Sequence, residues 1–364
     1  MRIVLSNASF KWGGVHRITE LLAAGFEERG HDVLVLCRPG SALEDRLRGR
    51  FGIASIAKGM DFSPLAIARI VATLKRYRAQ VVLTLMDKDL RLTGPAARML
   101  GLPVIARRAN DQPIDAGPYA RLVYGRIASH HIANSEATRA TLLQSAPWLS
   151  PEHVTVIYNG IDVDTIAATA PAFLPVPRNS IVIGFVGRLE TRKGVLDLLA
   201  AWPHIAQQDA RAQLVIAGRG PLEDQIHERA NQLERVTFLG YRDDVPALLK
   251  RCDLIAVPSH WEGFGLIAAE AMAAGKPVVA GNTSSLPEIV RDGIDGVLVP
   301  PNQPQALAEA LLGLVRNADL RRQLGQAGLQ RVRDRFTHGR MVAEYERTAS
   351  NLLRFGRISY PKDA

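Results

Sequence analysis

Two carboxylates lie close together in a glycine-containing stretch that directly follows an apolar run. The run Cys252–Val257 is bounded by turn residues and predicts a buried strand, and a helical pattern begins at Leu266. Glu262 lies in the turn, and Glu270 lies one helical turn beyond Leu266. Carboxylates accept hydrogen bonds from sugar or ribose hydroxyls, so both side chains are candidates for one pocket. The alternative is two solvated glutamates beside a helix end.

The same turn is a candidate anion site. The first N–H groups of a helix have no partner within the helix, and the helix dipole favours negative charge there. The candidate backbone groups belong to Gly263, Phe264, Gly265 and Leu266. A strand, a glycine turn and a helix start therefore predict a place for a phosphate.

Two cations follow the apolar run Ile181–Val186. Arg188 and Lys193 lie in the segment that begins at Gly187, where ligands bind at the carboxyl ends of strands in open α/β sheets. The segment nearly matches a phosphate-binding P-loop, but Arg192 stands where glycine is required, which excludes an NTPase of that type. Arginine and lysine together offer a fork of donors and a point charge to a diphosphate. A solvated loop with two surface cations is the alternative.

Two more loops in this half follow expected strands. Gly218 and Gly220 follow the first, and no third glycine comes at the spacing of a dinucleotide fingerprint, which argues against a dehydrogenase. Tyr241 and Arg242 follow the second. Either side chain can stack on a base, and surface placement is an equally good interpretation.

These loops need strands and helices to hold them, and the chain supplies an alternating pattern. Strands that alternate with helices predict mostly parallel sheets covered on both faces. The Pro-rich stretch 167–180 is the best candidate for a linker. The tail Arg333–Leu353 is expected to be one amphipathic helix. The other expected helices include Ile18–Arg29, Pro64–Arg78, Gly94–Leu100, Tyr119–Ser129, Val195–Trp202, Pro221–Leu233 and Val245–Arg251.

Taken together, the motifs resemble one family. The spacing Glu-x7-Glu from Glu262 to Glu270, followed by Gly275–Ala280 and Leu286–Val290, is similar in order and spacing to the retaining GT-B glycosyltransferases of family four. The resemblance spans nearly the whole chain and is strongest over Ile181–Pro300. It implies an α/β fold of the GT-B type, in which two Rossmann-like domains face a central cleft.

The resemblance also implies a domain division. Residues 1–170 are expected to form an acceptor-side Rossmann-like domain, and residues 171–340 a Rossmann-like domain that binds the nucleotide-sugar donor. A C-terminal helix at about 341–364 is expected to pack back on the first domain.

By the same resemblance, the chain transfers a sugar from a nucleoside diphosphate sugar with retention at the anomeric carbon. The implied route is a front-face reaction without a metal or cofactor, and a UDP-sugar is favoured over a GDP- or ADP-sugar. The implied catalytic residues are Glu262, Arg188 and Lys193. The implied donor-binding residues are Gly14, Gly187, Arg188, Lys193, Gly218, Tyr241, Arg242, Glu262, Gly263, Phe264, Gly265, Leu266 and Glu270.

The acceptor side is less well defined. Glycines after the first strand let backbone N–H groups approach a phosphate or sugar, or form a plain turn. Some relatives carry a sugar-contacting histidine where this chain has Asn110 and Asp111, which puts that contact in doubt. The expected acceptor-side residues are Gly13, Asp87, Lys88, Asn110 and Asp111.

Composition sets limits on the partners. The net charge of +9 lies mainly in residues 1–170 and suggests an anionic partner. The basic end of Pro64–Arg78 is a candidate contact for anionic membrane, although packing on the sheet explains its apolar face. The two cysteines, the absence of a membrane-spanning apolar run and the strand at the N-terminus favour a cytoplasmic protein. The basic helix end makes the inner face of the plasma membrane a candidate location.

The expected acceptor is a glycan or glycolipid, namely a lipopolysaccharide core or a lipid-linked oligosaccharide. A GT-B sugar-nucleotide epimerase remains an alternative, because it has the same two-domain architecture. A nucleic-acid-binding protein rests on the positive charge alone and lacks interleaved aromatics, so nucleic acid is not an expected partner.

Overall fold

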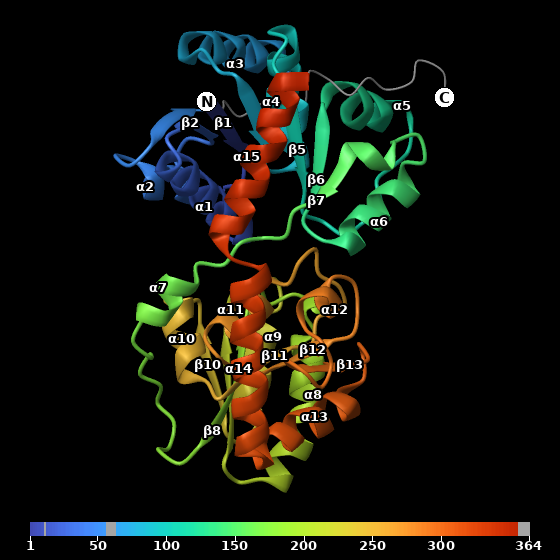
Figure 1. The fold of residues 1–364 in the computed structure, drawn as a ribbon. Coiled ribbons are helices and arrows are strands. Elements are labelled where there is room, and N and C mark those ends of the chain that lie inside the picture. The colour runs from blue at the N-terminus through green and yellow to red at the C-terminus, as the bar shows by residue number, and fades with distance from the viewer. Residues whose placement is uncertain (11, 56–62, 356–364) are drawn as a thin grey trace. The chain divides into compact units, whose positions relative to one another are not determined.

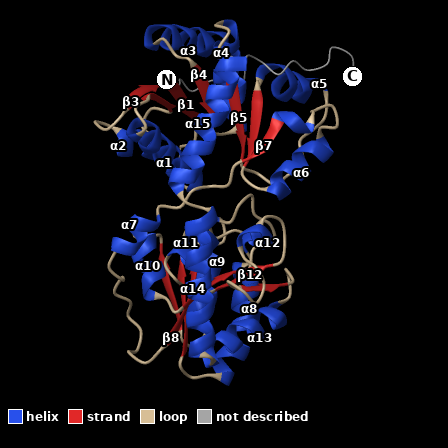
Figure 2. Ribbon diagram, in the orientation of Figure 1, coloured by secondary structure: helices blue, strands red, loops and turns tan. Residues whose placement is uncertain are grey.

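The computed structural model describes residues 1–10, 12–55 and 63–355, and it divides into two compact α/β units. The first unit comprises residues 1–160 together with the segment from His338 onward, and the second comprises Ile161–Thr337. Each unit has a parallel sheet between helices (Figures 1 and 2). The prediction of an α/β chain with two Rossmann-like units is confirmed.

The first unit contains a sheet with the strand order β3-β2-β1-β4-β5-β6-β7 among the described residues. Every strand pair is parallel, and the strands are rich in valine, isoleucine and leucine because both faces are buried. The strands are β1 Arg2–Asn7, β2 Asp32–Cys37, β3 Gly52–Ser55, β4 Val81–Thr84, β5 Val104–Arg108, β6 His130–Ala133 and β7 Val154–Val156. The helices are α1 Gly14–Glu28, α2 Ala42–Leu47, α3 Pro64–Tyr77, α4 Asp87–Met99, α5 Pro118–Ala120, the π-helix η1 Arg121–Ile127, α6 Glu136–Ser145, the 3₁₀ turn η2 Pro151–His153, and α15 His338–Phe355.

The second unit has the strand order β10-β9-β8-β11-β12-β13, again parallel throughout its described pairs. Its core contains Trp202 from α8 and the apolar side chains of the central strands. The strands are β8 Ile181–Val186, β9 Ala212–Ala217, β10 Val236–Gly240, β11 Leu254–Val257, β12 Val278–Gly281 and β13 Val297–Val299. The helices are α7 Val163–Ala168, the 3₁₀ turn η3 Thr191–Lys193, α8 Val195–Gln208, α9 Glu223–Gln232, α10 Val245–Arg251, α11 Leu266–Ala273, α12 Leu286–Ile289, α13 Pro304–Arg316 and α14 Ala318–Arg335.

The chain crosses between the units twice, after Gly160 and after Thr337. Both crossing points differ from the expected boundaries at residues 170 and 340. The first unit ends at Gly160 rather than at residue 170. The Pro-rich stretch 167–180 is not a linker, because it packs on the second unit: the Ala172 amide donates to the Ala247 carbonyl at 2.9 Å, and Leu174 is buried. The stretch is therefore a strap held against α10 and not a free connection.

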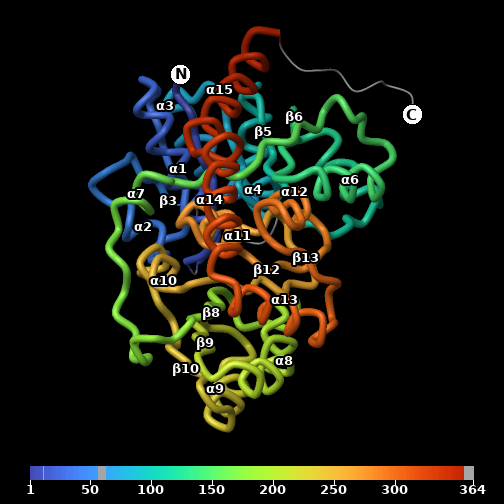
Figure 3. The backbone as a smooth tube through the Cα atoms, turned by 60° about the horizontal axis from the view of Figure 1, so that its bottom comes forward, coloured from blue at the N-terminus to red at the C-terminus, as the bar shows by residue number. Residues whose placement is uncertain are grey.

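The expected single tail helix is also wrong. Two helices, α14 and α15, cover this region and are separated at Phe336 and Thr337. Phe336 is buried, and its carbonyl accepts a hydrogen bond from the Ile161 amide at 2.7 Å, which fixes the chain there in a non-helical conformation. In the second unit α14 passes beside α11 (Figure 3), and Gly328 brings the two helices close at Met272. In the first unit α15 packs on α1, and residues 356–364 of the expected C-terminal helix lie outside the described residues.

Candidate active site

The second unit has a switch point between two neighbouring strands. The chain leaves β8 toward β9 on one side and later returns to place β11 on the other side of β8. The loops after these strands therefore diverge, and such a crevice at the carboxyl ends is where ligands bind in open α/β sheets. Arg188 and Lys193 follow β8, and Glu262 follows β11. The strand order thus brings the predicted cations and one predicted carboxylate to the same edge.

A glycine sets how closely the two loops approach. Gly194 ends the 3₁₀ turn η3 and has a φ of +66°, and a Cβ built on it would lie 1.9 Å from the Pro258 carbonyl oxygen. Only glycine fits this left-handed conformation against backbone. Because Lys193 precedes Gly194, this contact places the lysine beside the loop that carries Glu262.

Glu262 is a buried carboxylate with several partners. It is 5% exposed, and Lys193 Nζ forms an ion pair with its Oε1. The Ser259 hydroxyl donates to the same oxygen at 2.9 Å, and Arg192 lies 3.6 Å from Oε2. A buried charge is stable only when it is paired and hydrogen-bonded, so these partners explain how the carboxylate remains inside the protein.

The backbone of Glu262 is held as well. The hydroxyls of Ser284 and Ser285 donate to its carbonyl oxygen at 2.7 and 2.9 Å. These serines follow β12, the next strand of the sheet. Three strand ends therefore fix the position of one carboxylate.

Arg188 is placed differently from Lys193. Its side chain is 66% exposed and lies 3.2 Å from Glu190 Oε2. Glu190 also forms an ion pair with Arg192 at 2.6 Å. Arg188 thus extends from the same loop into solvent and is connected to the Glu262 cluster through Glu190.

The start of α11 has the expected glycine turn. Gly265 has a φ of +85°, and a Cβ on it would lie 2.7 Å from Leu286 Cδ2. The ring of Phe264 is buried and packs edge-on against Phe336 at 5.7 Å between centroids, so this side chain belongs to the core. Glu270 is also buried, on α11.

The loops after β8, β9 and β10 are joined by backbone hydrogen bonds. Gly187 donates to Ala217 at 3.0 Å, and Gly218 donates to Gly240 at 2.8 Å. Gly218 lies so close that a Cβ on it would meet the Gly187 carbonyl oxygen at 1.8 Å. These contacts place the expected donor glycines on one continuous edge of the sheet.

The structure gives Tyr241 and Arg242 different surroundings. Tyr241 is 46% exposed, and the Arg219 guanidinium lies over its ring at 4.2 Å. Arg242 instead forms a two-pronged ion pair with Asp244, and this contact lowers the pKa of the Asp244 carboxyl. Tyr241 is thus half-exposed with a cation over its ring, whereas Arg242 is held by a neighbouring carboxylate.

In the first unit, the expected acceptor-side residues lie in the loops after β1, β4 and β5. Gly13 caps α1, which begins at Gly14. Asp87 and Lys88 lie in the first turn of α4, which begins well before the expected Gly94. Asp87 forms an ion pair with Arg108.

The two residues after β5 also differ from each other. Asn110 is exposed, whereas Asp111 is half-buried and accepts a hydrogen bond from the Thr141 hydroxyl at 2.5 Å. Neither of them is a histidine, so the chain has no imidazole at these two positions.

Two features are absent from the part of the chain that the structure describes. No three His, Cys, Asp or Glu side chains are grouped there so that they could hold a metal ion. Within the same ranges, no helix has the length and apolar character needed to cross a membrane.

Sequence reasoning missed three side chains at this site, namely Glu190, Arg192 and Ser259. Arg192 was considered only as a mismatch to a P-loop. The signal that could have revealed the first two is the alternation of charge in Arg188-Leu189-Glu190-Thr191-Arg192. Ser259 carries no comparable signal, because a serine beside a loop glutamate is common.

Both units are doubly wound parallel α/β folds, and in the second unit charged side chains gather at the switch point, the place where open sheets of this class bind ligands. Residues 12–165 match the profile of Glycosyltransferase Family 4, and residues 168–331 match that of Glycosyl transferases group 1. The chain belongs to this family of GT-B glycosyltransferases.

Individual relatives agree with the family. A phosphatidyl-myo-inositol mannosyltransferase of Mycobacterium leprae is 37% identical over 221 residues, which cover 59% of this chain and 56% of that protein. A glycogen synthase of Mycobacterium tuberculosis is 37% identical over 189 residues, which cover 50% and 45%. The chain thus spans about half the length of these curated relatives. The crystal structure of Anabaena HepE in complex with UDP and glucose superposes with a TM-score of 0.81 and 24% identity over 97% of this chain and 100% of that one.

Proposed function

We propose that the chain is a retaining glycosyltransferase that moves a sugar from a nucleoside diphosphate sugar to a glycan acceptor. The observation that carries this proposal is the Lys193–Glu262 pair at the switch point of the second unit. It places a cation for a diphosphate beside a carboxylate for sugar hydroxyls, and α11 begins four residues after Glu262.

The residues act on the charge that develops as the bond breaks. The bond between the anomeric carbon and the diphosphate oxygen breaks, and the diphosphate gains negative charge. Arg188, Lys193 and the N–H groups at the start of α11 stabilise that charge, which is the usual way in which such sites lower a barrier. The acceptor oxygen bonds to the same face of the anomeric carbon, and its proton passes to the departing diphosphate oxygen. No metal takes part in this route.

The two glutamates have separate tasks in this scheme. Glu262 accepts hydrogen bonds from hydroxyls of the transferred sugar, and Glu270 accepts them from the ribose. Tyr241, half-exposed at the end of β10, offers a ring on which a base stacks. Uracil is the proposed base, and the UDP complex of the structurally similar HepE supports this choice.

The proposed acceptor is a cell-surface glycan, either a lipopolysaccharide core or a lipid-linked oligosaccharide. The relative that acts on phosphatidyl-myo-inositol supports a lipid-borne acceptor. Helix α3 provides a surface for such a substrate. Its residues Ala66, Ile70 and Leu74 are buried, whereas Leu65 in its first turn is 76% exposed and Lys75 and Arg76 in its last turn are exposed. An apolar and basic face of this kind binds anionic membrane at the inner face of the plasma membrane.

Sedimentation with vesicles tests the membrane contact. Wild-type protein is expected to bind vesicles of anionic phospholipid and not zwitterionic ones, and alanine at Lys75, Arg76 and Arg78 is expected to abolish binding. Vesicle binding by this variant at the wild-type level would contradict the proposed membrane contact.

Thermal unfolding with nucleotides tests the donor site. UDP at a hundred times its Kd is expected to add about 2.7 kcal/mol of stability, with or without chelator, and GDP and ADP are expected to add less. Lys193→Ala is expected to lose the UDP effect, and Lys75→Ala, an exposed lysine of the other unit, is expected to keep it. Transfer of sugar from UDP-sugar to an acceptor, with no isomerised sugar nucleotide released, separates the transferase from an epimerase.

A further inference from the structure

Charged side chains of alternating sign form a continuous row through the loop after β8. Arg188 lies 3.2 Å from Glu190, and Glu190 lies 2.6 Å from Arg192. Arg192 lies 3.6 Å from Glu262, whose other oxygen is paired with Lys193. The row therefore connects an exposed arginine to a buried glutamate that has a cation on each of its two oxygens.

We infer that Arg192 and Glu190 are positioning residues that allow Lys193 to change its partner from Glu262 to a bound diphosphate. This inference rests on the proposed function. When a nucleoside diphosphate binds, Lys193 turns from Glu262 to the diphosphate. Arg192 remains on Glu262, so the buried carboxylate keeps a cation during this exchange. Glu190 holds Arg192 and directs Arg188 toward the same ligand.

The burial of Glu262 makes the second cation necessary. A buried carboxylate that loses its partner costs far more than an exposed one, because it is removed from water without compensation. The Ser259 hydroxyl supplies one hydrogen bond to Oε1 but no charge. Without Arg192, the attraction of Glu262 would hold Lys193 in place and weaken its contact with a diphosphate.

Arg192 is well fixed for this task. Its guanidinium lies 4.4 Å from the centre of the Trp261 ring, and cation–π contact of this kind restrains a side chain. Its carbonyl accepts a hydrogen bond from the His260 amide at 2.8 Å. The His260 ring in turn lies 2.6 Å from Asp197 of α8. Arg192 therefore stays beside Glu262 when other partners move.

Binding of UDP to four variants tests the exchange. Arg192→Met is expected to weaken UDP binding about tenfold, and Arg192→Lys is expected to recover most of the loss because it keeps the charge. Glu262→Gln is expected to bind UDP more tightly than wild-type, since Lys193 no longer has an internal partner. In the Glu262→Gln background, Arg192→Met is expected to have little further effect on UDP binding.

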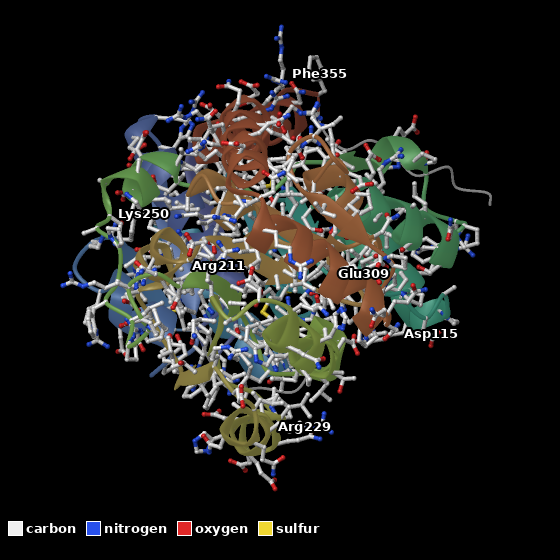
Figure 4. All side chains as sticks on the ribbon, turned by 90° about the horizontal axis from the view of Figure 1, so that it is seen from below. Asp115, Arg211, Arg229, Lys250, Glu309 and Phe355 are labelled. Atoms are coloured by element: carbon white, nitrogen blue, oxygen red, sulfur yellow. The ribbon has the colours of Figure 1, made fainter. Side chains whose placement is uncertain are left out.

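The control is an ion pair of similar make-up elsewhere in the unit. Asp209 and Arg211 are joined by two contacts at the amino end of β9, away from the switch point, and Arg211 is labelled in Figure 4. Arg211→Met is expected to leave UDP binding unchanged. The unfolding temperature of ligand-free Arg192→Met is measured in parallel. If Arg192 had a purely structural role, its loss would lower this temperature, but Glu262→Gln would change UDP affinity equally with and without Arg192.

Two results overturn the inference while leaving the donor site intact. These are full UDP binding by Arg192→Met, and an equal loss of binding for Arg192→Met with and without Glu262→Gln. If wild-type protein binds no nucleoside diphosphate at all, the proposed function fails, and the inference fails with it.

Discussion

The two units have the same strand order around their switch points, but the buried carboxyl group at each point has different partners. In the first unit, between β1 and β4, the buried Asp89 accepts hydrogen bonds from the Ala8 amide at 2.7 Å and the Met86 amide at 3.0 Å. In the second unit, between β8 and β11, the buried Glu262 is paired with side-chain cations. The partners of one carboxylate are backbone, and those of the other are side chains.

This difference separates a structural carboxylate from one suited to binding. Backbone amides cannot leave without moving their strands, so Asp89 fastens the loops after β1 and β4 to each other. Burial also raises the pKa of the Asp89 carboxyl well above its usual value. Lys193 and Arg192 have flexible side chains, and a ligand with negative charge can replace one of their contacts. A switch point is a candidate site only when its charges are exchangeable.

Glycine substitutions are expected to give the largest contrast between the units. Gly194→Ala should destabilise the protein by roughly 4 kcal/mol or more, because a Cβ collides with the Pro258 carbonyl oxygen at a positive φ. Gly13→Ala, at the first switch point, has extended backbone and no atom within 4 Å of a built Cβ. It should change stability by less than about 1 kcal/mol. Denaturant unfolding of both variants provides the comparison, and equal stabilities would contradict it.

The second-largest expected effect is the loss of catalysis when the charged side chains of the second unit are removed. Alanine at Arg188, Lys193 or Glu262 is expected to cut turnover about a hundredfold, since each stabilises charge or position in the transition state. Steady-state transfer from UDP-sugar measures the effect, with Arg211→Met, which lies away from the switch point, as the control. Full activity in any of the three variants would remove the role assigned to that residue.

Loss of the structural carboxylate should affect stability instead. Asp89→Ala leaves the buried Ala8 amide and the half-buried Met86 amide without this acceptor and is expected to cost about 2 kcal/mol. Asp45→Ala, at an exposed position of the same unit, should cost little. The affinity for UDP is expected to stay at the wild-type value, because the proposed donor-binding side chains Arg188, Lys193 and Glu262 belong to the other unit. Denaturant unfolding and UDP titration measure the two effects, and a large loss of UDP affinity would break the division of tasks.

A fall in pH is expected to destabilise the first unit more than the second, by a smaller amount than the substitutions above. Burial lowers the pKa of both His130 and His131 to about 4, with His153 contributing to both shifts. The stability that these neutral histidines contribute is fully present above the pKa of an unfolded histidine. It is lost as the pH falls toward their folded pKa of about 4. The loss is on the order of 1 kcal/mol for each histidine by about pH 6. None of the histidines in the described part of the second unit is buried.

Amide hydrogen exchange at falling pH tests this difference. The strands β5, β6 and β7 are expected to lose protection before β8 and β11, after correction for the intrinsic pH dependence of exchange. Simultaneous loss in both units would show that the two histidines do not control the acid response. His131→Gln is expected to make the first unit less sensitive to acid, even if it is less stable at neutral pH.

The sequence by itself determined the local elements and the place of the charged groups along them. Apolar runs and glycine turns located β8, β11 and the start of α11, and the motif resemblance named Arg188, Lys193, Glu262 and the family. These features are readable because strand and helix periodicity and turn chemistry act over a few residues. The site residues at strand ends follow directly from that pattern.

Only the tertiary structure decided which of these groups meet. Lys193 and Glu262 are 69 positions apart and become partners because β8 and β11 are neighbours in the sheet. The same holds for the pairing of Arg192 with Glu262, for the Pro-rich strap on α10, and for Asp89, whose carboxylate joins two strand ends. Each depends on the order of strands and on burial, and neither quantity is encoded in a short stretch of sequence.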